Sequence, residues 1–69
     1  MFADVQQRLL DATNDLSNDI KLAAIYALGE GGYDNPQVQA RLLVLSANLH
    51  LDIRIAALKA LGRASIKRT

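Results

Sequence analysis

The sequence repeats itself with a period of 33 residues. Residues 5–32 align with residues 38–65 without a gap, and thirteen of the twenty-eight positions are identical. The first members of the identical pairs are Val5, Gln6, Arg8, Leu9, Leu10, Leu16, Asp19, Ile20, Ala23, Ala24, Ala27, Leu28 and Gly29. Self-similarity at a period of this length is typical of chains built from stacked copies of one supersecondary unit. The fold must therefore accommodate two copies of the same unit, in which residues 33 positions apart are equivalent.

Each copy contains two segments with the apolar spacing of an amphipathic helix. Apolar residues recur at intervals of three and four, which predicts first helices over about residues 3–14 and 36–48 and second helices over about 19–29 and 52–64. The first helices carry Val5, Leu9 and Ala12, and Val38, Leu42, Leu45 and Leu49. The second helices carry Ile20, Ala23, Ala24, Ala27 and Leu28, and Ile53, Ala56, Ala57, Ala60 and Leu61. The alanine-rich stripe of each second helix favours close packing against the first helix of the same repeat.

Helix-ending and helix-starting residues separate these segments. The glycine-rich segment 29–32 permits the backbone that ends a helix, and Asn35 followed by Pro36 is a typical helix start. Ser17, Asn18 and Asp19 are all competent N-caps for the second helix of the first copy, and His50, Leu51 and Asp52 take that place in the second copy. These signals mark the turns between all four helices.

The pattern predicts an all-α fold with four helices in two stacked antiparallel hairpins. We expect a single domain of residues 1–69, with repeat 1 at about 3–32 and repeat 2 at about 36–65. Repeat arrays generally need three or more units and polar ends, so two units leave an end face uncovered. Homodimerisation, docking onto a larger protein, or truncation from a longer array would each account for that face.

Composition excludes several classes of protein. The chain has no cysteine, which excludes disulfides and thiolate metal sites and makes the cytoplasm the expected location. No apolar run approaches the ~20 residues of a membrane span, so we expect no membrane contact. The formal net charge of +1 is too small for a dedicated binder of phosphate backbones, and nucleic acid is not the expected partner.

The sequence offers no catalytic constellation. There is one histidine, His50, and it falls in a predicted turn, where a solvated residue or a weak cap is the simpler interpretation. The Gly29-Glu30-Gly31-Gly32 segment follows a helix and lacks the lysine of a phosphate-binding loop, so it is interpreted as a helix stop. We therefore expect no enzyme activity, no catalytic residue, no metal and no cofactor.

The second helices resemble those of a known repeat family. DIKLAAIYALGEGG and DIRIAALKALGRAS are similar to the second helix of HEAT repeats, particularly the short variety named after phycobilisome (bilin) lyases. The resemblance implies a right-handed α-solenoid in which the second helices line the concave side. It also implies a ladder of Asp19, Lys21, Asp52 and Arg54 between neighbouring repeats, weakened at Lys21, which lacks the planar fork of arginine. It does not carry the lyase activity, because nothing here resembles a bilin site.

The second helices also carry apolar residues opposite their core stripe. These candidate partner-binding residues are Leu22, Ile25, Tyr26, Ile55, Leu58 and Lys59. A helix that is apolar all round is normally buried, so the residues predict a patch that a partner covers. For Ile25 and Leu58, packing between the two repeats is an equal alternative. Tyr26 is the favoured anchor, since it combines apolar area with a polar tip.

Three functions compete at this point. The first is a protein-binding or scaffold module, such as a small accessory subunit of a larger complex, whose partner is another protein or a second copy of the chain. The second is an accessory subunit of a bilin or tetrapyrrole lyase. The third is weak nucleic-acid binding through the basic residues Arg54, Lys59, Arg63, Lys67 and Arg68.

Overall fold

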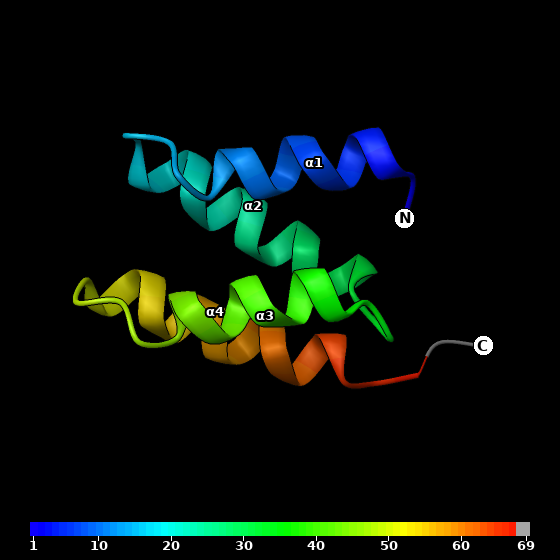
Figure 1. The fold of residues 1–69 in the computed structure, drawn as a ribbon. Coiled ribbons are helices and arrows are strands. Elements are labelled where there is room, and N and C mark those ends of the chain that lie inside the picture. The colour runs from blue at the N-terminus through cyan, green and yellow to red at the C-terminus, as the bar shows by residue number, and fades with distance from the viewer. Residues whose placement is uncertain (68–69) are drawn as a thin grey trace.

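The computed structural model describes residues 1–67, which form four α-helices and no strand, so the predicted all-α class is confirmed. The helices are α1 (Ala3–Ala12), α2 (Asn18–Gly31), α3 (Pro36–Leu45) and α4 (Leu51–Ala64). Figure 1 shows α1 and α2 above α3 and α4, with both intra-repeat turns at one end of the molecule and the linker at the other. The arrangement is two stacked hairpins.

Hydroxyl side chains end the first helix of each repeat earlier than the apolar pattern predicts. Thr13 Oγ1 donates to the Leu10 carbonyl at 2.6 Å, and Ser46 Oγ donates to the Leu43 carbonyl at the same distance. Each hydroxyl thereby satisfies a carbonyl that has lost its helical partner. As a result α1 and α3 stop at residues 12 and 45 instead of the predicted 14 and 48.

The second helices begin differently in the two repeats. Ser17 caps α2, because its Oγ accepts from the Ile20 amide at 3.4 Å, whereas His50 makes no side-chain cap for α4. The linker ends with a conventional start for α3, in which Asn35 Oδ1 accepts from the Val38 amide at 3.1 Å. Asp34 just before it has a φ of 55°, which turns the chain into repeat 2.

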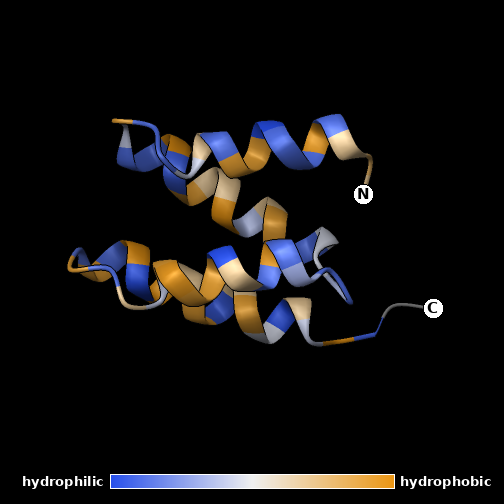
Figure 2. Ribbon diagram, in the orientation of Figure 1, coloured by the Kyte–Doolittle hydropathy of each residue, from blue (hydrophilic) through white to orange (hydrophobic). Residues whose placement is uncertain are grey.

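The core lies mainly between the two second helices and α3. Its largest fully buried side chains are Val38, Ile25, Leu28, Leu42 and Ile53. The α2–α4 contact is the most extensive between helices, and α1 contributes only Leu10 among buried apolar residues. Figure 2 shows the corresponding difference in hydropathy, since α3 is more apolar along its length than α1.

A glycine sets the distance between α2 and α4. A Cβ atom on Gly29 would lie 2.8 Å from both Cα and Cβ of Ala60, closer than carbon atoms normally pack. This close approach joins the second helices of the two repeats, whereas the alanine stripe predicted one between the second and the first helix of each repeat. In the part of the chain that the structure describes, no helix combines the length and the apolar character needed to cross a bilayer.

Candidate functional site

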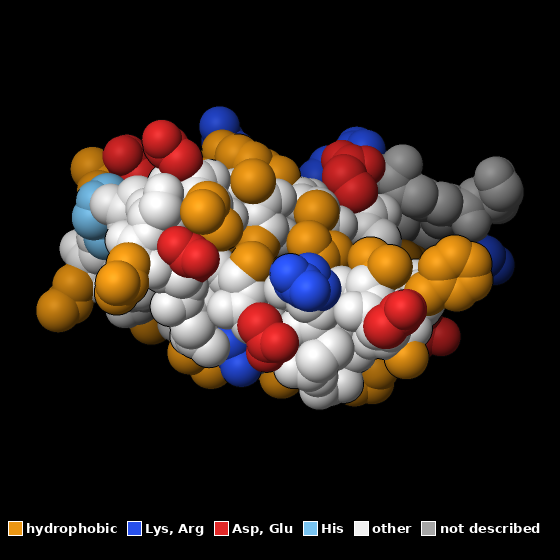
Figure 3. Space-filling model, turned by 90° about the horizontal axis from the view of Figure 1, so that it is seen from above, with side chains coloured by type: hydrophobic (Ala, Val, Ile, Leu, Met, Phe, Trp, Pro, Cys, Tyr) orange, Lys and Arg blue, Asp and Glu red, His pale blue; other side chains and the backbone are white. Residues whose placement is uncertain are grey.

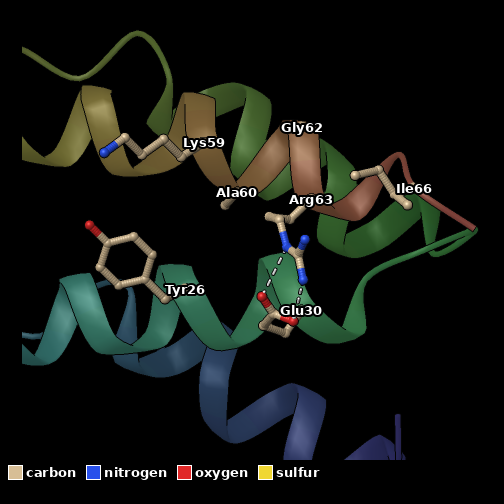
Figure 4. A pocket seen from close by; sticks show the side chains of 7 residues that line it. All are labelled: Tyr26, Glu30, Lys59, Ala60, Gly62, Arg63 and Ile66. Carbon is tan, nitrogen blue, oxygen red and sulfur yellow. Dashed lines mark hydrogen bonds and ion pairs between the residues drawn. The ribbon is translucent and has the colours of Figure 1, made fainter. Parts of the chain in front are cut away.

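An open groove of about 540 Å³ lies between α2 and α4, on the side away from α1 and α3 (Figure 4). It is lined by Tyr26, Glu30, Lys59, Ala60, Gly62, Arg63 and Ile66. The two second helices supply all of these residues except Ile66, which follows α4. The groove exists because the side chain between the helices is small at Ala60, while longer ones stand at the ends of the groove.

A bidentate ion pair spans the groove. Arg63 Nε donates to Glu30 Oε1 at 3.0 Å, and Arg63 Nη2 donates to Glu30 Oε2 at 3.2 Å. The hydrogen bond and the attraction of the carboxylate raise the pKa of the Arg63 guanidinium above its ordinary value. About half of each side chain is exposed, so solvent screens the pair. The two residues are equivalent, and the pair links matching points of the two repeats.

Tyr26 and Lys59 are also equivalent residues, and they face each other across the other end of the groove (Figure 4). Tyr26 is 50% exposed, and Lys59 is exposed as well. Neither the Tyr26 hydroxyl nor the Lys59 ammonium has a hydrogen-bonding partner within residues 1–67. This end of the groove therefore offers an aromatic face, a hydroxyl and an unpaired cation to an incoming group.

The six candidate partner-binding residues separate into two groups. Ile25 is fully buried in the core, so the alternative of packing between the repeats applies to it and the residue cannot contact a partner directly. Leu22 is half-buried and packs against the same core. The others are exposed, with Tyr26 and Lys59 in the groove and Ile55 and Leu58 outside it.

The ladder implied by the HEAT resemblance does not form between these two repeats. Within residues 1–67 the one ion pair is that of Glu30 and Arg63, and no pair joins Asp19, Lys21, Asp52 or Arg54. Those four residues lie in the first turns of α2 and α4, whereas the helices make their closest approach farther along, where Gly29 meets Ala60. The Glu30–Arg63 ion pair lies near this point of closest approach.

A second link between the repeats was not anticipated from the sequence. Arg41 Nη1 donates to Thr13 Oγ1 at 2.8 Å and to the Leu10 carbonyl at 3.3 Å, which ties α3 to the end of α1. The sequence signal that could have indicated this link is the identity of Arg8 and Arg41 in the repeat alignment. For Glu30 and Arg63, the signal was a pair of opposite charges 33 residues apart.

Residues 1–67 contain no group of three His, Cys, Asp or Glu side chains that could hold a metal ion. His50 is exposed, and its Nε2 lies 3.0 Å from Asn18 Nδ2, which connects the two repeats near the intra-repeat turns. Arg68, one of the basic residues considered for nucleic-acid binding, lies outside the described residues.

Comparison with protein-family models, with curated proteins and with solved structures gave no match.

Proposed function

We propose that this chain is a protein-binding module, acting in the cytoplasm as a small accessory subunit or scaffold within a larger complex. The observation that carries the proposal is the groove between α2 and α4, with exposed Tyr26 and Ile66 at its edges. The resemblance of the second helices to those of HEAT repeats agrees with a protein-binding role, because the second helices of such repeats line the concave side. The proposed ligand is a segment of another protein.

The chemistry of the groove specifies that segment. Tyr26 and Ile66 provide apolar area, and a half-exposed aromatic side chain is a frequent anchor of protein interfaces. Within the part of the chain that the structure describes, Lys59 has no carboxylate partner, while Arg63 already has one in Glu30. The expected ligand is therefore a short amphipathic helix that places an apolar side chain beside Tyr26 and a carboxylate beside Lys59.

The matched pair Tyr26→Ala and Tyr33→Ala tests this proposal. Both tyrosines are about half exposed, but Tyr33 lies in the linker and does not line the groove. A photo-reactive group at position 26 should cross-link a partner in extracts of cells that make the protein, and mass spectrometry would identify it. With that partner purified, we expect Tyr26→Ala to weaken binding by about tenfold or more and Tyr33→Ala to leave it unchanged.

Charge reversal provides the second arm of the experiment. Lys59→Glu should weaken binding of the same partner, and changing the facing carboxylate of the partner to lysine should restore it. Equal binding by the wild type, Tyr26→Ala and Lys59→Glu would contradict the proposal. Circular dichroism of each variant checks that the helices remain formed.

A further inference from the structure

The outer face of repeat 2 is the equivalent of a face that repeat 1 buries. Leu10 is 4% exposed, whereas its equivalent Leu43 is 60% exposed. Ile25 is 0% exposed, whereas its equivalent Leu58 is 57% exposed. The residues are similar, so the difference arises because repeat 1 has a neighbour on this side and repeat 2 has none. An apolar surface shaped to be covered by a repeat is thus left open.

The outer face of repeat 1, at the opposite end of the molecule, is equivalent to the face with which repeat 2 covers repeat 1. Val38, Ile53 and Ala56 of repeat 2 are fully buried where it stacks on repeat 1. Their equivalents in repeat 1 are the same residues, Val5, Ile20 and Ala23, and all three are exposed. Figure 3 looks onto this end and shows apolar side chains lying among charged ones. One chain therefore carries both halves of an interface that it already makes internally.

The polar groups of that interface are also duplicated. Arg41 donates to Thr13 Oγ1 and to the Leu10 carbonyl. The Ser46 hydroxyl donates to the Leu43 carbonyl, as the Thr13 hydroxyl donates to the Leu10 carbonyl. Arg8, the equivalent of Arg41, has no hydrogen-bonding partner among the described residues. It lines a hollow of about 490 Å³ on the outer side of repeat 1. The Ser46 hydroxyl of another chain could accept a hydrogen bond from Arg8, as the Thr13 hydroxyl accepts one from Arg41.

The charges of the two halves are complementary. Residues 1–35 contain six carboxylates and two cations, a formal charge of −4, whereas residues 36–69 contain one carboxylate and six cations, a formal charge of +5. Two chains that met through the same end would bring like charges together, which is unfavourable. Two chains that met end to opposite end would join the acidic half of one to the basic half of the other.

We propose that the chain associates with a second copy of itself, head to tail, so that repeat 1 of one copy stacks on repeat 2 of another. The register is that of the two repeats within the chain. Gly62 has open space around it, and it would receive Ala27 of the next copy as Gly29 receives Ala60. Arg63 would then lie between two Glu30 side chains, one from each copy.

This interface does not close on itself. The two contacting surfaces are different, so every added copy leaves one of each kind free, and growth continues beyond the dimer. Lys59 of one copy would face Tyr26 of the next as it faces Tyr26 within the chain, so the groove of one copy would continue into the next.

Sedimentation equilibrium of the full chain over a wide concentration range tests the proposal. We expect the average mass to rise with concentration past that of a dimer, and to fall when NaCl is raised from about 0.05 M to about 0.5 M, because the charge attraction is screened. Leu43→Glu with Leu58→Glu should weaken association at least about tenfold. Val44→Asp is the matched control, since Val44 is equally exposed on α3 but is equivalent to Asp11, which stays exposed in repeat 1.

Mixing two blocked chains distinguishes the head-to-tail interface from others. The second variant, Ile20→Glu with Ala23→Glu, blocks the outer face of repeat 1 and should also stop growth when alone. An equimolar mixture of the two double variants should form a one-to-one dimer, because each retains one intact surface. Failure of the mixture to associate, or self-association of either variant that stops at a dimer, would overturn the proposal.

A single methyl group provides a test that does not depend on charged substitutions. Gly62→Ala has space in the isolated chain but removes the space that Ala27 of the next copy needs. We expect it to weaken association while the helical circular dichroism is unchanged. A wild-type chain that stays monomeric at millimolar concentration, or an association that Gly62→Ala leaves unchanged, would also overturn the proposal.

Discussion

Gly29 and Gly62 are equivalent residues of the two repeats, and the structure gives them opposite surroundings. Gly29 is buried against Ala60, where even a Cβ atom would be too close, whereas a Cβ built on Gly62 would have nothing within 4 Å beyond its chain neighbours and the backbone of its own helix. The same holds for Ile25 in the core and Leu58 on the surface. In a repeat protein the residue type makes a position suitable for burial, and the presence of a neighbouring repeat decides whether the position is buried.

The largest difference between equivalent positions is expected at residues 25 and 58. Ile25→Ala should lower the free energy of unfolding by about 2–5 kcal/mol, because it leaves a cavity in a core that cannot fully collapse. Leu58→Ala should change it by no more than about 0.5 kcal/mol, since the side chain is already in water. Urea denaturation at low protein concentration measures both, and equal losses would mean that the two repeats do not differ as described.

At residues 29 and 62 the same substitution should have effects of opposite sign. Gly29→Ala should destabilise the fold by about 1–3 kcal/mol, because α2 and α4 must move apart. Gly62→Ala should stabilise it by about 0.5–1 kcal/mol, because alanine loses less backbone entropy than glycine in a helix. Thermal and urea unfolding of the two variants would sharpen the comparison, and effects of the same sign would contradict it.

The caps of α2 and α4 provide a smaller contrast. Ser17→Ala should cost about 0.5–1 kcal/mol, near the low end for a cap because its hydrogen bond is long. His50→Ala should cost less, since His50 makes no cap and only an exposed contact with Asn18. The measurement is the same urea titration. A larger loss for His50→Ala would assign the turn of repeat 2 a role that the structure does not give it.

The ion pair between the repeats should have the smallest effect. Glu30→Gln should lower the melting temperature slightly at low ionic strength, because both side chains are about half exposed. The difference from wild type should vanish near 1 M NaCl, where the screening length is about 3 Å. Differential scanning calorimetry at two salt concentrations measures this, and a loss that persists in high salt would show that the pair acts through packing.

Local signals allowed most of the secondary structure to be predicted. Asn35 and Pro36 marked the start of α3 correctly, because capping and proline geometry depend only on neighbouring residues. The ends of α1 and α3 were predicted two to three residues too late, since the hydroxyls of Thr13 and Ser46 compete with the next helical turn. Of the residues that line the groove, Tyr26 and Lys59 were predicted as partner-binding residues, a role that stays a prediction, while Glu30, Arg63 and Ile66 were not expected there.

What the sequence determined by itself was the repeat, its helices and the equivalence of positions 33 residues apart, because these follow from periodicity and local backbone preference. Only the tertiary structure decided which member of each pair is buried. Ile25 and Leu58 have equivalent places in their helices, and burial depends on what stacks against each helix, which periodicity does not contain. The same reason explains why Glu30 meets Arg63 while Arg8, with the side chain that Arg41 uses to join the repeats, faces solvent.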